Sequence, residues 1–283
     1  MVVYQFSFKG TMAMTNIDKI GFIGGGNMAE AIIKGLIEAA CPASKILVAE
    51  PSDLRRGHLA DAYKVNVTSD NLDVMRQCDL VVLAIKPQIA DEVISGIASV
   101  YRKETLLVTI LAGISCAYLE GHFDTAARVV RVMPNTPALV GEAATAICQG
   151  HNTSHDDLML VQHLFETVGQ VQQIDERQMD AVTGLSGSGP AYVYTIIEAL
   201  ADGGVREGLR RDIAHALAVQ TVVGAALMVR ETGEHPAILR DRVCSPGGTA
   251  ITGVSTLEKN GLRTTLMEAV SAASKRSREL GGS

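Results

Sequence analysis

The fold of this chain is decided by one stretch near its start, Lys19-Ile20-Gly21-Phe22-Ile23-Gly24-Gly25-Gly26-Asn27-Met28-Ala29. It begins as a short apolar strand, passes through three consecutive glycines and continues into a segment whose apolar residues recur at helical spacing. Gly24, Gly26 and Ala29 fit the pattern G-x-G-x-x-G/A. In this pattern the first glycine makes a tight turn, the second lets a pyrophosphate approach, and the small third residue lets helix and strand pack. The stretch therefore predicts a strand, a turn and a helix that bind a dinucleotide.

A second apolar strand, over residues 45–49, ends in Glu50. An acidic residue at this distance from the glycines binds the ribose 2′-hydroxyl of NAD. Arg55 and Arg56 follow closely, and arginines there can instead pair with the 2′-phosphate of NADP. The cofactor prediction is therefore NADPH or NADH, with a lean to NADH because a carboxylate repels a phosphate.

Helical and strand patterns alternate up to about residue 176. Helices are predicted over residues 53–63 and around 93–97, and strands over 65–68, 80–85, 105–111, 129–132, 143–148 and 168–172. The helix between the last two strands opens with a capping box formed by Ser154 and Asp157. This alternation predicts an α/β Rossmann dinucleotide-binding domain over residues 18–176, built on a mostly parallel sheet.

Two polar residues beyond strand ends are further candidates for the cofactor site. Ligands of doubly wound sheets lie outside the carboxyl ends of the strands, where Lys86 could reach a ribose or a phosphate. Asn135 lies in an extended polar loop between Pro134 and Pro137, and we expect it to line the nicotinamide end of the site.

The second half, residues 177–283, has only helical patterns and predicts an all-helical dimerisation and substrate domain. Helices are expected over residues 191–201, 212–229, 236–242, 250–259 and 262–280, with an interruption at Asp202-Gly203-Gly204 after the first. The helix over residues 212–229 is apolar nearly all round. This is a larger apolar surface than a single small helical domain can bury. This indicates a homodimer in which two helical domains share a core.

Composition excludes several classes of protein. The chain of 283 residues is 47% hydrophobic and carries a formal net charge of −6, which argues against a partner that is a nucleic acid or an anionic membrane. Five widely spaced cysteines indicate reduced thiols in a cytoplasmic protein, and the loop histidines His151 and His155 lack a convincing metal pattern, so no metal is expected. Residues 1–17 are expected to be a disordered extension, with Met1, Met12 and Met14 left open as translation starts.

A turn near the end of the chain, Ser245-Pro246-Gly247-Gly248-Thr249, precedes a predicted helix. The glycines allow close backbone approach, and the unpaired amides of a helix N-terminus favour a small anion. Read from its residues alone, the turn is either an anion cradle or a tight connection.

Together with five other motifs, this turn gives the chain a resemblance to the pyrroline-5-carboxylate reductases, the last enzymes of proline biosynthesis. The motifs that carry the resemblance are Gly21 to Met28, Ala84-Ile85-Lys86-Pro87, Met133-Pro134-Asn135-Thr136-Pro137, Gly184 to Tyr192, Ala201-Asp202-Gly203-Gly204 and Ser245 to Thr249. The resemblance covers about residues 18 to 280. It implies hydride transfer from NADPH or NADH to the cyclic imine 1-pyrroline-5-carboxylate, giving L-proline, in a homodimer that in relatives often assembles into a ring of dimers.

The resemblance also assigns roles by motif. It implies cofactor contacts from Ile23, Gly24, Gly25, Gly26, Asn27, Met28, Glu50, Asn71, Ala84, Ile85, Lys86, Pro87 and Ala112. Substrate contacts are implied for Glu176, Ser245, Gly247, Gly248 and Thr249, and for position 250. The amides around residues 247–249 would hold the carboxylate. Ser245 and Thr249 are the candidate catalytic hydroxyls, and the proton donor stays open.

One position departs from the family. Relatives often carry Ser or Thr after the turn, where it hydrogen-bonds the ring nitrogen, but this chain has Ala250. Losing one neutral hydrogen bond, worth on the order of 1 kcal/mol, would cost roughly tenfold in affinity or rate.

Two other classes of protein compete with this interpretation. A related hydroxy-acid dehydrogenase would use a lysine on the first helices of the helical domain, yet no lysine occurs between Lys103 and Lys259. A nucleotide-sensing protein without catalytic activity would need no cradle for a carboxylate.

Overall fold

The computed structural model describes residues 17–123 and 127–281. The chain divides into two compact units. The first runs to Gly187 and takes in the end of the last helix from Ala273, and the second is Ser188–Ala272. Of the expected extension, residues 1–16 lie outside the described residues, whereas Ile17 is buried in the core of the first unit.

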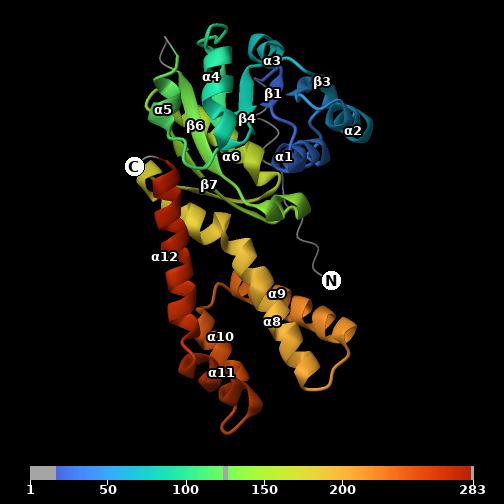
Figure 1. The fold of residues 1–283 in the computed structure, drawn as a ribbon, viewed down its shortest axis with the longest axis vertical. Helices are drawn as coiled ribbons and strands as arrows, with labels where there is room; N and C mark the ends of the chain where they lie inside the picture. The colour runs from blue at the N-terminus through green and yellow to red at the C-terminus, as the bar shows by residue number, and fades with distance from the viewer. Residues whose placement is uncertain (1–16, 124–126, 282–283) are drawn as a thin grey trace. The chain divides into compact units, whose positions relative to one another are not determined.

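The first unit is built on one eight-stranded sheet (Figure 1). Its strand order is β3-β2-β1-β4-β5-β6-β7-β8, and all neighbours are parallel except β6 and β7. The strands are β1 Ile20–Ile23, β2 Ile46–Ala49, β3 Asn66–Thr68, β4 Leu80–Leu83, β5 Leu106–Thr109, β6 Arg128–Met133, β7 Ala143–Gln149 and β8 Gly169–Gln173. The order reverses between β1 and β4, and such a switch point is where doubly wound sheets bind their ligands. The predicted Rossmann sheet is confirmed.

Helices cover both faces of this sheet. The elements are α1 Asn27–Glu38, η2 Ala43–Lys45, α2 Asp53–Tyr63, α3 Asn71–Gln77, η3 Pro87–Ile89, α4 Ala90–Ala98, α5 Cys116–Glu120, η4 Thr136–Val140, α6 His155–Glu166, η5 Glu176–Gln178, α7 Met179–Val182 and the π-helical turn η6 Thr183–Gly187. The predicted capping box at Ser154 and Asp157 opens α6. The short helices α3 and α5 were not predicted.

The central strands are buried on both faces. In β4, Leu80 and Val82 belong to a core cluster with α1 and α6, whereas Val81 and Leu83 belong to a second cluster with α3, α4 and α5. Strand side chains alternate between faces, so a strand covered on both sides becomes a continuous apolar run. This explains why the strands were easy to recognise in the sequence.

The second unit is helical, as predicted. Its helices are α8 Gly189–Arg206, α9 Arg211–Thr232, α10 Pro236–Val243 and α11 Thr249–Lys259, and α12 Leu262–Leu280 begins in this unit. The interruption expected at Asp202-Gly203-Gly204 is wrong, because α8 continues to Arg206. A Cβ atom on Gly204 would lie 3.2 Å from the Cβ of Ala214, so this glycine lets α8 and α9 approach each other.

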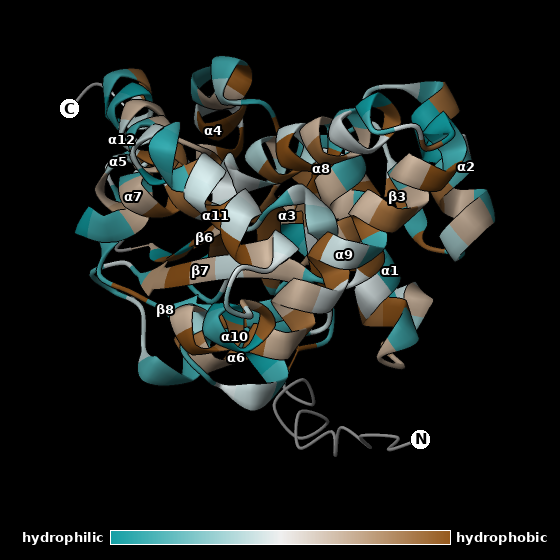
Figure 2. Ribbon diagram, turned by 90° about the horizontal axis from the view of Figure 1, so that it is seen from below, coloured by the Kyte–Doolittle hydropathy of each residue, from teal (hydrophilic) through white to brown (hydrophobic). Residues whose placement is uncertain are grey.

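Apolar residues run along the ribbons of α8 and α9 (Figure 2). Helix α9 is long and apolar enough to cross a membrane. The core helix of a soluble protein can have the same length and composition. Within the chain Leu217 is 55% exposed and Met228 51%.

The predicted boundary after Glu176 falls inside the first compact unit, because the residues up to Gly187 pack with the sheet. Met179 is fully buried in the second core cluster, and Asn135 bonds the carbonyl of Ser186. The assignment of residues 177–283 to a separate functional domain stays a prediction.

Candidate functional site: a glycine turn, an acidic groove and a helix-opening turn

The glycine turn after β1 has a backbone that a larger residue would strain. Gly24 has a φ of +96°, and its N–H donates to Ala49 O at 2.8 Å. A Cβ atom on Gly24 would lie 2.6 Å from Ala84 O. Gly26, in contrast, has ordinary dihedrals as the N-cap of α1, and a Cβ atom there would have no atom within 4 Å. The first glycine is thus required by the fold, and the second leaves open space where a ligand could approach.

Glu50 lies beside this turn, as its position after β2 predicts. Its carboxylate accepts hydrogen bonds from Gly25 N at 2.9 Å and from Ser52 N at 3.0 Å. These bonds hold the carboxylate at the end of β2, where a dinucleotide-binding sheet receives the adenosine ribose.

Arg55 and Arg56, which in the sequence point to NADPH where Glu50 points to NADH, already form hydrogen bonds and ion pairs. Arg55 Nε donates to Gly25 O at 2.5 Å, and its guanidinium pairs with Glu30. Arg56 donates to Glu50 O at 2.6 Å and pairs with Asp53. These bonds fix both arginines beside the glycine turn and the end of β2.

Glu30, on α1, ties the turn to α2. Burial raises the pKa of its carboxyl, but hydrogen bonds from His58, Tyr63 and Arg55 outweigh burial and lower the pKa from 4.5 to about 2. The ionised carboxylate thus fixes Arg55 against the glycine turn.

The remaining cofactor candidates follow strand ends. Ala84, Ile85, Lys86 and Pro87 come directly after β4, and Ala112 follows β5. Ala84 N donates to Ile23 O at 2.8 Å, which joins this segment to the glycine turn. Asn71 opens α3, after the N-cap Asp70. The carboxyl ends of the parallel strands β1, β4 and β5 lie at one edge of the sheet, so most of these candidates share that edge.

Asn135 has a structural role that its sequence context did not indicate. The side chain is 8% exposed, its Nδ2 donates to Ser186 O at 3.0 Å, and its Oδ1 accepts from Ala144 N at 3.0 Å. The amide thus clamps the loop to β7 and η6, and its contact with nicotinamide stays a prediction.

Glu176 opens η5 and is held by two donors that the sequence analysis missed. Its Oε1 accepts from Cys116 N at 2.8 Å and from Arg131 Nη1 at 3.1 Å. The Arg131 side chain is only 10% exposed. The sequence did contain a sign of this pair, because Arg131 lies within the apolar strand Val129-Val130-Arg131-Val132 and a buried charge needs a partner of opposite charge.

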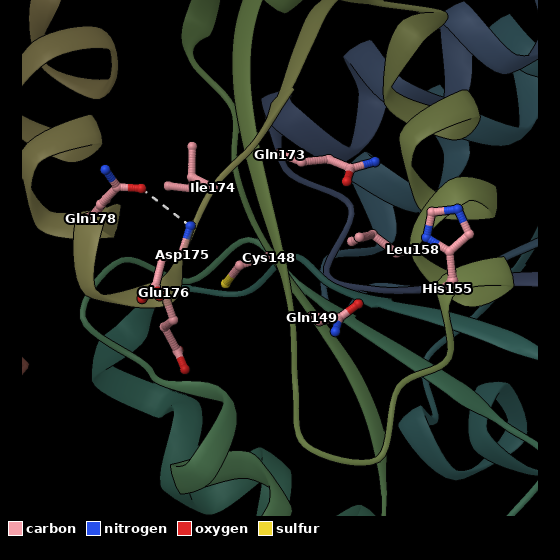
Figure 3. Close-up of a pocket in the computed structure, with 9 residues that line it drawn as sticks. All are labelled: Cys148, Gln149, His155, Leu158, Gln173, Ile174, Asp175, Glu176 and Gln178. Atoms are coloured by element: carbon pink, nitrogen blue, oxygen red, sulfur yellow. Dashed lines mark hydrogen bonds between the residues drawn. The ribbon is translucent and has the colours of Figure 1, made fainter.

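An open groove of about 670 Å³ adjoins Glu176 (Figure 3). It is lined by Cys148, Gln149, His155, Leu158, Gln173, Ile174, Asp175, Glu176 and Gln178. In the view of Figure 3, Cys148 lies between Glu176 on one side and His155 on the other.

The thiols of Cys116 and Cys148 lie close to Glu176. The neighbouring Cys148 thiol, burial and the Glu176 carboxylate all raise the pKa of Cys116 far above its ordinary value. Both cysteines are free thiols, as the sequence predicted.

In the second unit, residues 245–248 form a tight turn. Gly248 N donates to Ser245 O at 3.0 Å, and Gly247 has a φ of +67°. Gly248 is the N-cap of α11, so Thr249 is not the cap but the first helical residue, followed by Ala250. The first amides of an α-helix have no partner within the helix, and those of Thr249 and Ala250 therefore stay available to an anion.

The fold and these features define a class of protein: a dinucleotide-binding oxidoreductase with a Rossmann unit followed by a helical dimerisation region. Residues 19–113 match the family model described as NADP oxidoreductase coenzyme F420-dependent. Residues 176–280 match the model for pyrroline-5-carboxylate reductase dimerisation. The chain belongs to the pyrroline-5-carboxylate reductase family, because it is similar over nearly its whole length to members of that family.

Among these relatives, the pyrroline-5-carboxylate reductase of Arabidopsis thaliana is 48% identical over 93% of this chain and 95% of its own length. The pyrroline-5-carboxylate reductase of Synechocystis is 48% identical over 93% of this chain and 98% of its own length. The solved structure from Coxiella burnetii aligns with a TM-score of 0.89 at 35% identity, covering 94% of this chain and 99% of that one. The pyrroline carboxylate reductase structure from Plasmodium falciparum, which has NADP bound, aligns with a TM-score of 0.84 at 36% identity. The alignment covers 94% of this chain and 98% of that one. Neither a hydroxy-acid dehydrogenase nor a nucleotide-sensing protein is supported by these similarities.

Proposed function

We propose that this protein reduces 1-pyrroline-5-carboxylate to L-proline with NADPH or NADH. The observation that carries the proposal is the turn before α11. Its Gly247 takes a positive φ, its Gly248 caps the helix, and the amides that follow have no partner within the helix. A substrate with one carboxylate and one imine needs an anion cradle, an oriented nicotinamide and a partner for the ring nitrogen, and little else.

The residues of the turn take separate roles in this proposal. The amides of Thr249 and Ala250 bind the substrate carboxylate, and Ser245 and Thr249 supply the hydroxyls nearest to it. Because Ala250 has no hydroxyl, the hydrogen bond that relatives give the ring nitrogen falls to Thr249 or to water. Glu176, fixed by Arg131 and Cys116 N, completes the substrate contacts in this proposal.

The nicotinamide cofactor supplies the hydride when bound. We propose that it is held by residues 23–28 of the glycine turn, by Glu50 at the adenosine ribose, by Asn71, by residues 84–87, by Ala112, and by Asn135 at the nicotinamide end. The Glu50 carboxylate, which repels a 2′-phosphate, favours NADH over NADPH in this proposal.

The working form is proposed to be a homodimer. The match to a dimerisation model and the exposed apolar residues of α9 both support this state. Assembly into a ring of dimers is a proposal that comes from the resemblance. A cytoplasmic location is proposed from the widely spaced cysteines, and the absence of nucleic-acid and membrane partners from the net charge of −6.

The deciding assay mixes purified protein, 1-pyrroline-5-carboxylate and NADPH or NADH, and follows cofactor absorbance. We expect oxidation of the cofactor that depends on the imine, with L-proline as the product. If neither cofactor is oxidised, the proposed function is wrong.

A matched pair of variants on α11 tests the cradle. A Cβ atom on Gly248 would overlap Ser245 Oγ and lie 3.1 Å from Ser245 O, whereas one on Gly253 would have nothing within 4 Å. We expect Gly248→Ala to lower kcat/KM for the imine about tenfold with cofactor affinity unchanged, and Gly253→Ala to change neither. An equal loss of imine and cofactor binding would show that the turn is only structural.

A further inference from the structure

Three potential metal ligands converge at the side of the groove, from separate parts of the chain. Cys116 opens α5, Cys148 lies on β7 and Glu176 opens η5. Their sulfur and carboxylate ligand atoms all lie within 4.8 Å of one another. The two cysteines are 2% and 3% exposed. We propose that Cys116, Cys148 and Glu176 form a binding site for a thiophilic divalent cation such as Zn²⁺ or Cd²⁺.

The donor set and its spacing suit such a cation. Two thiolates and one carboxylate select soft or borderline metals over Mg²⁺ or Ca²⁺. With Zn–S near 2.3 Å and Zn–O near 2.0 Å, tetrahedral ligand atoms lie about 3.5–3.8 Å apart. The donor atoms therefore need to move inward by about 1 Å at most, which side-chain rotation can supply.

The surroundings orient and balance the site. Arg131 Nη1 and Cys116 N both donate to Oε1 of Glu176, and such bonds to a ligating carboxylate are the usual outer contacts of protein metal sites. Binding releases one proton from each thiol. The two thiolates and the carboxylate then carry three negative charges, which the divalent cation and the Arg131 guanidinium neutralise. The guanidinium thus offsets the one surplus negative charge of the ligands.

The groove provides the path of entry. Cys148 and Glu176 both line it (Figure 3). A cation in the groove therefore meets Cys148 and Glu176 first, and the ligand atom of Cys116 lies within 4.8 Å of theirs.

Occupancy would act on the reaction through Glu176. This step rests on the proposed function, in which the Glu176 carboxylate contacts the substrate. A cation that takes this carboxylate removes it from the imine, so Zn²⁺ is expected to inhibit the enzyme.

The first experiment measures binding without substrate or cofactor, and so does not depend on the proposed activity. Reduced protein is titrated with Cd²⁺, and the ultraviolet absorption of cadmium–thiolate bonds is followed. We expect saturation at one equivalent per chain and loss of this tight equivalent in Cys148→Ser and Cys116→Ser. Cys41→Ser removes a half-buried thiol elsewhere and is expected to keep it. The proposed site would be wrong if the unmodified protein bound no Cd²⁺ tightly, or if Cys148→Ser bound one Cd²⁺ as tightly as the unmodified protein.

The second experiment tests the carboxylate and the link to activity. Glu176→Gln is expected to keep the cadmium–thiolate absorption but weaken Zn²⁺ binding at least about tenfold. In the reductase assay, Zn²⁺ should inhibit the unmodified enzyme and Cys41→Ser, and should inhibit Cys148→Ser far less. Equal inhibition of all three would refute the link through Glu176. Failure of the assay itself would count against the proposed function and leave the titration result intact.

Discussion

The two glycines of the turn after β1 are predicted to fail in different ways when replaced by alanine. In Gly24→Ala, a residue with a Cβ atom must keep a φ of +96°, which costs about 1–2 kcal/mol. The new methyl group also lies 2.6 Å from Ala84 O and 2.9 Å from Ala84 C, and relieving this overlap costs about 1–3 kcal/mol more. We therefore expect Gly24→Ala to lose about 2–5 kcal/mol of unfolding free energy.

Gly26→Ala should spare the fold and damage cofactor binding. Gly26 has φ −68° and ψ −177°, which alanine adopts without strain, and its Cβ position is empty. Alanine is a poorer N-cap than glycine, which limits the expected loss to about 1 kcal/mol. Its methyl group projects into the space that a pyrophosphate needs, so the Kd for NADH and NADPH should rise at least about tenfold.

Urea denaturation and titration of cofactor fluorescence separate the two effects. A denaturation midpoint of Gly24→Ala equal to that of the unmodified protein would refute the argument from backbone strain. Unchanged cofactor affinity in Gly26→Ala, with its fold intact, would refute the placement of the pyrophosphate at this turn.

Three further predictions concern the cofactor, acid stability and assembly. Glu50→Ser removes the carboxylate that repels a 2′-phosphate, so the ratio of kcat/KM for NADH to that for NADPH should fall about tenfold; an unchanged ratio would exclude Glu50 as the selector. The pKa of Glu30 is lowered from 4.5 to about 2, so its stabilisation is present above pH 4.5 and disappears as the pH falls toward 2. Between pH 4.5 and 2, the unfolding free energy of Glu30→Gln should therefore fall by about 1–2 kcal/mol less than that of the unmodified protein. The same pH dependence in both proteins would contradict this. Light scattering should report a dimer, and a stable monomer would contradict the shared helical core.

The order and type of the long elements could be predicted because their causes are local. The strands that face cores on both sides are continuous apolar runs, and the glycine turn needs a positive φ that few other residues accept. The interruption of α8 was predicted wrongly from Gly203 and Gly204. There a tertiary contact, the approach of Ala214 on α9, overrides the low helix propensity of glycine.

The candidate site could be predicted only where one short segment carries it. The turn at residues 245–249 and the glycine turn are contiguous, so their residues could be named in advance. The sequence also contained Glu50, Arg55 and Arg56, but only the structure shows that both arginines already have hydrogen-bond partners.

The cluster of Cys116, Cys148 and Glu176 could not have been found in the sequence. Its ligands come from α5, which contacts β6, from β7, and from η5, which follows β8, and β6, β7 and β8 are neighbours in the sheet. The pair His151 and His155 is the kind of metal site that spacing alone can suggest, and His155 is in fact the first residue of α6.

The helical unit links assembly to stability. Among its described residues, the buried apolar cluster consists of Ala201, Ala214 and Ala218. Larger apolar side chains remain in contact with solvent, with Leu217 55% and Met228 51% exposed on α9. Complete burial of such a side chain contributes about 1.5–3 kcal/mol, so each half-exposed one can still gain about 1 kcal/mol when covered. This cluster, with Ile197 and Val205 partly buried beside it, is small against the entropy of ordering the helices. In the proposed homodimer a second copy covers the exposed side chains, so the melting temperature of the protein should rise with protein concentration.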